Sequence, residues 1–222
     1  DGIILIDSGY SEQVDTVLLP GMRALELDPA DIEYVIVAHG HRDHYGGSRF
    51  LQSAYEARIV LSAADWDFMD QYRTDSAGGT NGQPPERDLL AVEGEAIVLG
   101  DVAVTPVLVP GHTPGALGLI FPVQDGSQTH LAGMFGGTIL VSSRISDEGL
   151  QQYIESVEHF SAIAYEMGVN VEIQNHPIID DMAVKLPMLG ARAPTDPHPF
   201  VVGTDAYQRF LGVIAECTRV EV

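Results

Sequence analysis

The segment from His39 to His44, H-G-H-R-D-H, constrains this chain more than any other feature of its sequence. Four of its six residues carry side chains that bind divalent transition metals, namely His39, His41, Asp43 and His44. Imidazole nitrogens combined with a carboxylate oxygen suit zinc. Gly40 permits a sharp backbone turn that would direct the first two imidazole rings at one point. The segment therefore predicts a metal site.

Two further histidines stand in rigid loops of a similar kind. His112 lies in G-H-T-P-G and His176 in N-H-P, and each follows a predicted strand. A single loop histidine is weak evidence, but metal ligands must be held rigidly and these loops contain proline or glycine. Two zinc ions with three protein ligands each need six ligands. The chain supplies that number as His39, His41, Asp43, His44, His112 and His176.

The other histidines lack such a context. His159 falls within a predicted helix and His198 in a proline-rich segment, so we assign both to structure or solvent. His130 stands in neither kind of loop.

Apolar periodicity predicts an α+β fold in one domain that covers residues 1–222. The expected strands and hairpins are 2–6, 33–38, 59–61, 96–99 with 102–109, 116–121 with 129–132, and 169–173. The expected helices are 11–27 with an interruption at Pro20, 48–57, 148–167 and 205–216. Residues 70–88 are expected to form a surface loop. This order predicts two sheets with helices outside them and the candidate ligands at strand ends.

The formal net charge of −21 limits the partners of this chain. Such a surface repels phosphate groups, which argues against nucleic acid and anionic membranes as partners. The acidic residues are scattered along the chain, which favours solubility or salt adaptation over electrostatic selection of a substrate. No apolar run approaches the roughly 18 residues of a membrane span. Cys217, the single cysteine, excludes an intrachain disulfide and a multi-thiolate zinc site.

The compartment and the oligomeric state stay open at this point. The chain starts at Asp1 within an apolar strand pattern, without an initiator methionine. A removed signal peptide would leave such a start and would imply a periplasmic or secreted location, and a truncated chain would look the same.

Four features of the sequence occur together, namely H-G-H-R-D-H, G-H-T-P-G, the downstream N-H-P and the opening strand that ends Ile6-Asp7-Ser8-Gly9. In this combination the chain resembles the metallo-β-lactamase-fold hydrolases. The resemblance covers most of the chain and implies a four-layer αβ/βα sandwich with a dinuclear zinc site at one edge of its two sheets. It implies that His39, His41 and His112 hold the first zinc. It also implies that Asp43, His44 and His176 hold the second.

Two departures from the family pattern are informative. Many members place a metal-bridging aspartate where this chain has Met134, and a thioether does not replace that carboxylate. The lack of a bridging aspartate and of a cysteine ligand is similar to the third, all-His/Asp subclass of the true metallo-β-lactamases. Family members also have one or two strands before the strand that corresponds to residues 3–6, and this sequence has none.

The resemblance implies a zinc-dependent hydrolase, and we favour a β-lactamase. Zinc lowers the pKa of bound water to roughly 7, which provides a nucleophile for the lactam carbonyl at neutral pH. The first zinc would polarise that carbonyl, the second would stabilise the nitrogen anion after ring opening, and Asp43 would orient the nucleophile. The alternatives are hydrolysis of another ester, lactone or thioester, and a non-catalytic zinc-binding protein. The expected substrate is a small molecule.

Groups that would bind the carboxylate of a β-lactam are less well defined. Thr138, Ser142 and Ser143 follow Met134 and are candidate hydroxyl donors, although strand-end or capping roles explain them equally well. We interpret Arg42 as a packing residue beside the ligands rather than as a substrate clamp.

Overall fold

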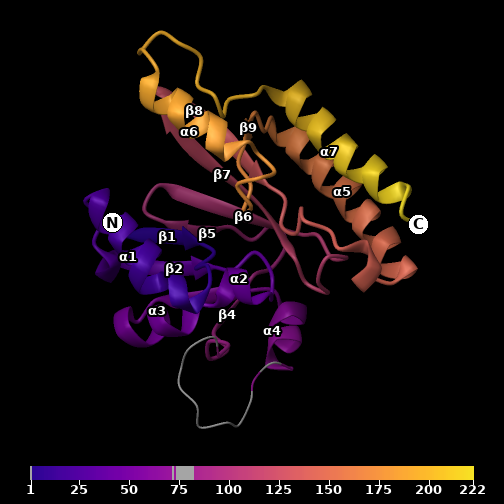
Figure 1. Cartoon of the computed structure of the whole chain (residues 1–222), viewed down its shortest axis with the longest axis horizontal. Coiled ribbons are helices and arrows are strands. Elements are labelled where there is room, and N and C mark those ends of the chain that lie inside the picture. Colours follow the sequence, from indigo (N-terminus) through magenta and orange to yellow (C-terminus); the bar gives the residue numbers. More distant parts are fainter. Residues whose placement is uncertain (1, 72, 74–82) are drawn as a thin grey trace.

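Two β-sheets lie face to face at the centre of the molecule, and helices cover the outer side of each sheet (Figure 1). The computed structural model describes residues 2–71, 73 and 83–222. The first sheet is parallel and has the order β1 (Ile3–Ile6), β2 (Ile32–Ile36), β3 (Arg58–Leu61) and β4 (Leu89–Leu90). The second has the order β5 (Ile97–Leu99), β6 (Val102–Leu108), β7 (Leu117–Asp125), β8 (Gln128–Met134) and β9 (Val171–Glu172). Its strands pair antiparallel, except that β8 and β9 run parallel.

The space between the sheets is filled by apolar side chains from both. Ile36 and Val60 of the first sheet belong to the same buried cluster as Leu119 and Met134 of the second. Their neighbours in sequence, Val35 among them, point to the other face and are also buried. A parallel strand with helices outside it is buried on both faces, which explains the uninterrupted apolar run 34–37.

The helices of the first sheet are short. α3 (Ser48–Tyr55) and α4 (Ala63–Asp70) contribute Leu51, Trp66 and Met69 to the cluster that packs on β2 and β3. α1 (Leu19–Ala24) adds Met22 to the same cluster. These contacts form the outer helical layer of this half.

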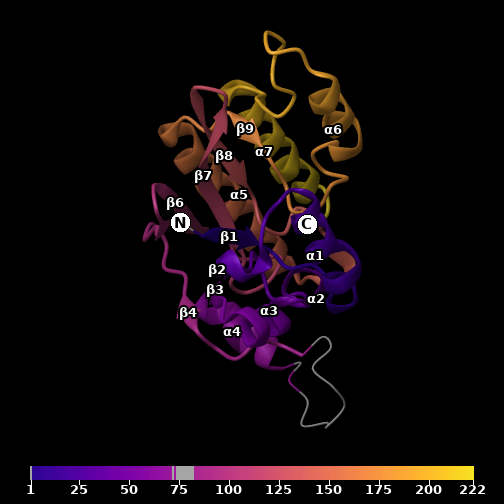
Figure 2. The same cartoon turned by 90° about the vertical axis from the view of Figure 1, so that its left-hand side faces the viewer.

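Two long helices cover the second sheet. α5 (Asp147–Met167) and α7 (Thr204–Arg219) lie side by side in Figures 1 and 2, on the opposite side of the molecule from α3 and α4. Ser146 caps α5 by accepting a hydrogen bond from Gly149 N, and Gly168 ends the helix with a left-handed φ of 74°. The resulting order of helices, sheet, sheet and helices is the predicted four-layer α+β sandwich.

Most of the predicted elements are present, and the main differences concern helices. The predicted helix 11–27 is divided into a 3₁₀ turn (Ser11–Gln13), a π turn (Val14–Leu18) and α1, and Pro20 stands in the first turn of α1. The prediction missed α2 (Arg42–Tyr45), α4 and α6 (Met182–Ala191), and α6 contains Pro187. Two further 3₁₀ turns lie at Pro29–Asp31 and Ser142–Arg144.

Of the predicted loop 70–88, residues 72 and 74–82 lie outside the described part of the chain. The described residues 83–88 contain no helix or strand.

None of the helices in the described residues has the length and hydrophobicity that a membrane span requires.

Candidate metal centre

Three histidine side chains from two loops converge on one point. His39 and His41 follow β2, and His112 lies on the loop between β6 and β7. The Nε2 atom of His112 lies 3.1 Å from His39 Nε2 and 3.1 Å from His41 Nδ1. We call His39, His41 and His112 the first group.

A second group lies directly beside the first. Asp43 and His44 are on α2, whose N-cap is His41, and His176 follows β9. Asp43 Oδ2 lies 3.3 Å from His44 Nε2 and 4.0 Å from His176 Nε2. The rings of His39 and His44 are 3.8 Å apart between centroids, so the two groups share one site.

The spacing within these groups fits zinc. Zinc–nitrogen bonds of about 2.0–2.1 Å at tetrahedral angles place ligand atoms roughly 3.3 Å apart. The contacts of 3.1 Å in the first group and 3.3 Å in the second are close to this value. In addition, His44 Nε2 is buried and has no hydrogen-bond partner in the described structure. A metal ion would satisfy this atom.

Gly40 is required by close packing. A Cβ atom at this position would lie 2.9 Å from Phe68 Cδ1 and 3.0 Å from Met69 Cγ, which are both on α4. Its φ is not positive, so the left-handed region is not the reason for a glycine here. The absence of a side chain lets the loop that carries His39 and His41 lie directly against α4.

Burial sets the protonation state of the first group. It lowers the pKa of His39 well below its ordinary value and lowers that of His112 to about 3. Burial also lowers the pKa of His41. Neutral imidazole is the form that binds metal, so these ligands are ready for a cation at neutral pH.

The second group differs because carboxylates surround His44. The close contact with His44 Nε2, at 3.3 Å, lowers the pKa of Asp43 to about 2, so this side chain is a carboxylate at neutral pH. Burial opposes protonation of His44, but the charge of Asp7 and the close contact with Asp43 outweigh it and raise the pKa of His44 to about 10. Without a cation this histidine is therefore an imidazolium.

Asp7 orients His44 from the end of β1. Its Oδ2 lies 2.6 Å from His44 Nδ1, and its Oδ1 accepts a hydrogen bond from Ala38 N at 2.7 Å. Asn175 Nδ2, beside His176, approaches the same Oδ2 at 3.4 Å. Asp7 has a φ of 58°, a left-handed conformation that aspartate tolerates better than most residues. The contact orients the ring of His44 so that its Nε2 atom faces Asp43. Histidines that bind metal commonly have such a carboxylate partner on the other ring nitrogen.

Asp65 performs a similar task for the first group. This fully buried carboxylate on α4 accepts hydrogen bonds from Gly40 N and Thr113 Oγ1, both at 2.7 Å. It also accepts one from Gly115 N at 2.6 Å. Gly40 belongs to the loop of His39 and His41, whereas the other two donors belong to the loop of His112. One carboxylate thus joins the two loops that supply the first group.

The two groups line a cavity of about 840 Å³. All ligand candidates except His44 are on its wall. The remaining wall combines apolar or aromatic side chains with two arginines, namely Tyr10, Phe68, Ile139, Val141, Ile145, Arg42 and Arg144. A small molecule could therefore reach the candidate metal site.

The structure places the other residues considered from the sequence away from this wall. Thr138 is buried and is not part of the lining, and Ser142 Oγ donates a hydrogen bond to Glu221 Oε2 at 2.7 Å. Ser143 does not line the cavity either. By contrast, Arg42, which we interpreted as a packing residue, is exposed on the cavity wall.

The three histidines outside the two groups lie elsewhere. His159 is on α5 and its Nε2 lies 3.1 Å from Glu93 Oε1. His130 and His198 line a separate hollow near Asp125 and Arg192. None of the three belongs to a metal-binding cluster among the described residues.

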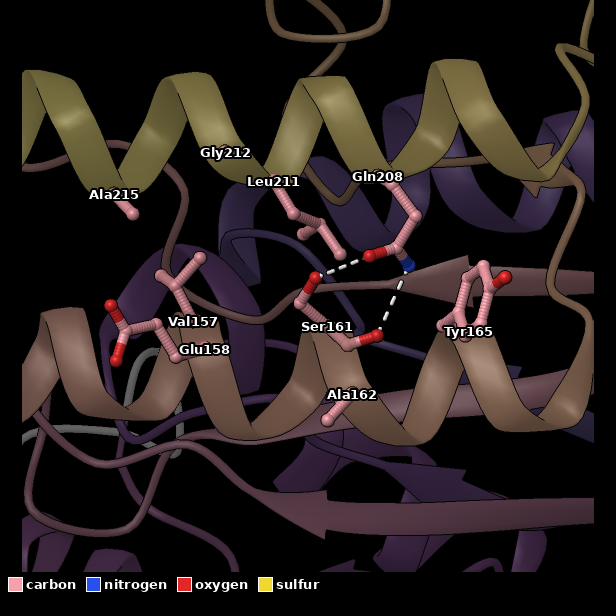
Figure 3. Close-up of a pocket in the computed structure, with 9 residues that line it drawn as sticks. All are labelled: Val157, Glu158, Ser161, Ala162, Tyr165, Gln208, Leu211, Gly212 and Ala215. Atoms are coloured by element: carbon pink, nitrogen blue, oxygen red, sulfur yellow. Dashed lines mark hydrogen bonds between the residues drawn. The ribbon is translucent and has the colours of Figure 1, made fainter.

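A smaller hollow of about 370 Å³ between α5 and α7 has no comparable chemistry (Figure 3). Ser161 Oγ donates to Gln208 Oε1 at 2.6 Å, and Gln208 Nε2 donates to Ser161 O at 3.0 Å. Glu158, on the same wall, pairs with Arg219. Ser161, Gln208 and Glu158 thus bond within the protein, and no metal-binding cluster among the described residues lies in this hollow.

Several residues that shape the site were not predicted from the sequence. No role was predicted for Asp65, Phe68 or Arg144, which lie in segments with no metal-binding motif. Asp7 had a partial signal, since it belongs to the I-D-S-G strand end on which the family resemblance rests. Its contact with His44 spans 37 positions and depends on the pairing of β1 with β2.

Comparison with known proteins agrees with this geometry. The model of the metallo-β-lactamase superfamily matches residues 1–125, more than half of the chain. The chain belongs to this superfamily.

Curated relatives share only part of their length with this chain. A probable polyketide biosynthesis zinc-dependent hydrolase, BaeB, of Bacillus velezensis is 32% identical over 93 residues, which are 41% of this chain and 35% of BaeB. A hydroxyacylglutathione hydrolase of Nostoc punctiforme is 26% identical over 123 residues, 55% of this chain and 42% of that protein. The chain thus matches less than half of the length of either relative.

Solved structures match over almost the whole chain. BJP-1, a subclass B3 metallo-β-lactamase of Bradyrhizobium japonicum, matches with a TM-score of 0.81 at 22% identity. The match covers 99% of this chain and 83% of the BJP-1 chain. FEZ-1, a metallo-β-lactamase from Legionella gormanii, has a TM-score of 0.82 at 20% identity and covers 99% and 85%. At these identities the match shows that the fold is shared.

Proposed function

We propose that this protein is a zinc-dependent hydrolase and that its substrate is a β-lactam. The observation that carries the proposal is the pair of three-ligand groups, built only from histidine and aspartate, of which all members but His44 line an open cavity. A structural zinc site is closed by four protein ligands, whereas a catalytic site keeps a position open. Three ligands per group and access from the cavity therefore favour catalysis over a non-catalytic zinc-binding role.

The residues of the two groups would hold two zinc ions. When bound, zinc supplies Lewis acidity and a coordinated water of lowered pKa. Asp43, on the wall of the cavity, remains ionised at neutral pH because its pKa is about 2. A carboxylate with so low a pKa is a weak base. We therefore assign Asp43 to holding zinc and orienting the nucleophile by accepting its hydrogen bond, rather than to removing its proton.

Met134 supports a lactam over a thioester. This residue ends β8 and is buried between the two sheets with Ile36 and Leu119, so the position of the bridging aspartate in many thioesterases is part of the apolar core. The solved structures named above are metallo-β-lactamases. Thioester hydrolysis is the second candidate, because one curated relative is a hydroxyacylglutathione hydrolase.

The test is hydrolysis of a chromogenic cephalosporin by zinc-loaded protein, with a chelator-treated sample as its control. Turnover that disappears with the chelator and returns with zinc is expected. The same preparation is assayed with a glutathione thioester and an aryl lactone, and its zinc content is measured. Two zinc ions per chain with turnover of the thioester alone would overturn the lactam assignment in favour of the second candidate.

A further inference from the structure

Most basic side chains of this acidic protein are already paired. The chain has 11 lysines and arginines against 32 acidic residues. Seven of the basic side chains form ion pairs with carboxylates, namely Arg49, Arg58, Arg73, Arg87, Lys185, Arg192 and Arg219. The other four, Arg23, Arg42, Arg144 and Arg209, have no ion pair or side-chain hydrogen bond with any residue that the structure describes. With acidic groups so abundant, four guanidinium groups without a partner among the described residues are an exception.

Two of these four arginines line the metal cavity. Arg42 is the first residue of α2, between two candidate ligands, and Arg144 ends the 3₁₀ turn Ser142–Arg144. Two segments about a hundred positions apart thus each supply one guanidinium group to the same cavity. Both side chains are exposed, so solvent hydrates them until a ligand arrives.

The turn that carries Arg144 is closed by its own backbone and is tied to the C-terminal segment through Ser142. Arg144 N donates a hydrogen bond to Val141 O at 2.9 Å, and Ser142 Oγ donates to Glu221 Oε2 at 2.7 Å beyond the end of α7. The hydroxyl group of Ser142 is therefore already in use. Thr138 Oγ1 is buried away from the cavity lining. The two arginines are therefore better candidates for binding an anion than these hydroxyl groups, which the sequence suggested.

The rest of the wall indicates what kind of anion would fit. Ile139, Val141 and Ile145 flank Arg144, and Phe68 lies across the ring of His41 with centroids 5.7 Å apart. An apolar body can lie against these side chains while an anionic group meets guanidinium. The planar guanidinium group binds carboxylates through two parallel hydrogen bonds. A net charge of −21 repels anions at long range, so an anionic substrate needs such local positive groups.

We propose that Arg144 and Arg42 bind the carboxylate of the substrate and make the enzyme select anionic over neutral molecules of the same shape. The proposal rests on the proposed hydrolase function only for the reaction that follows binding. The binding step itself does not depend on that function. The two arginines act as specificity determinants and take no part in bond cleavage.

The binding experiment uses a cephalosporin and its neutral methyl ester as paired probes. KM and kcat for both probes are measured from initial rates with zinc-loaded wild type, Arg144→Ala, Arg42→Ala and Arg144→Lys, and calorimetry gives the affinities of any protein that does not turn the probes over. A charged hydrogen-bonded contact contributes enough that Arg144→Ala should weaken binding of the free acid by about 10- to 100-fold. Binding of the methyl ester should change by less than about twofold. Arg144→Lys should restore part of the loss, because it retains the charge without the planar fork.

The control is Arg209→Ala on α7. Like Arg144, Arg209 has no ion pair with any described residue, but it is not on the cavity wall, so its replacement should leave both affinities unchanged. Zinc content is measured for every variant to exclude loss of metal. If wild type turns over the acid, Arg144→Ala should raise KM with little change in kcat, because the contact is equal in ground and transition states.

The outcomes separate this proposal from the proposed function. Equal affinity of wild type for acid and ester would overturn the arginine assignment even if β-lactams are hydrolysed. So would an equal loss of both affinities in Arg144→Ala. If wild type hydrolyses no β-lactam, the same comparison is made with a 4-nitrophenyl succinate half-ester and its methyl diester. A preference for the half-ester that disappears in Arg144→Ala would uphold the anion site while the lactam assignment fails; equal use of the two esters would reject it.

Discussion

Asp65 Oδ1 accepts a hydrogen bond from the backbone N–H of Gly115 at 2.6 Å, across 50 positions of the sequence. The other oxygen of the same carboxylate accepts from Gly40 N and Thr113 Oγ1. The two loops that carry the first group therefore share one hydrogen-bond acceptor. The distance between these loops depends on Asp65, which is not itself a ligand.

Asp65→Asn should weaken zinc binding at the first group. The amide presents one acceptor oxygen and one donor nitrogen where three donors point inward, so one buried N–H group loses its partner. This costs about 1–3 kcal/mol in the free energy of unfolding. Loss of such outer contacts lowers metal affinity by about 10- to 100-fold. Urea unfolding of the metal-free protein and zinc titration against a chromophoric chelator measure the two effects.

Asp67→Asn is the matched control on the same helix. Asp67 is exposed and pairs with Arg87 at the surface, so its replacement should change stability by less than about 0.5 kcal/mol. Unchanged zinc affinity in Asp65→Asn would show that the two loops hold their positions without this carboxylate.

Asp7→Asn should affect the second group selectively. The amide preserves the size of the side chain and tolerates the left-handed backbone of Asp7, but it removes the negative charge beside His44 Nδ1. A partner of this kind contributes about 10- to 100-fold to metal affinity. Calorimetric titration should therefore show one zinc binding as in wild type and one binding more weakly. Equal weakening of both would indicate that Asp7 supports the whole site and not His44 alone.

His112→Ala should remove zinc from the first group and abolish turnover. Only His39 and His41 would then remain there, and two ligands hold zinc poorly. The zinc content after dialysis should fall from two ions per chain to one. His159→Ala should change neither zinc content nor rate, because His159 lies on α5 beside Glu93. Two retained ions in His112→Ala, or metal loss in His159→Ala, would mean that the ligands are assigned wrongly.

Zinc affinity should depend on pH at the second group and hardly at the first. The pKa of His44 is raised to about 10 without metal, so below that pH zinc must displace its proton. Affinity should therefore rise about tenfold per pH unit from pH 6 to 8, the slope for one displaced proton. Burial lowers the pKa of His112 to about 3, so this ligand is already neutral over the same range. Titrations at several pH values measure both slopes, and parallel slopes would contradict the prediction.

The candidate ligands were predictable because their signal is local. His39, His41, Asp43 and His44 lie within six positions, so the covalent chain itself keeps them near one another. His112 and His176 were recognisable by the proline and glycine around them, and the structure brings both to the predicted groups. The two sheets and the long helices followed from apolar periodicity, because a buried face repeats at the period of its element.

The contacts that the supporting residues make were decided by the tertiary structure. Asp7 meets His44 because β1 pairs with β2, and Asp65 meets Gly115 because α4 packs against the loop between β6 and β7. Arg144 reaches the cavity wall through a turn with no periodic pattern. A hydrogen bond across 37 or 50 positions depends on how the layers stack, and side-chain periodicity records only which face of an element is buried. The sequence by itself thus determined which residues could bind metal, whereas packing determined which residues orient them and which charges line the cavity.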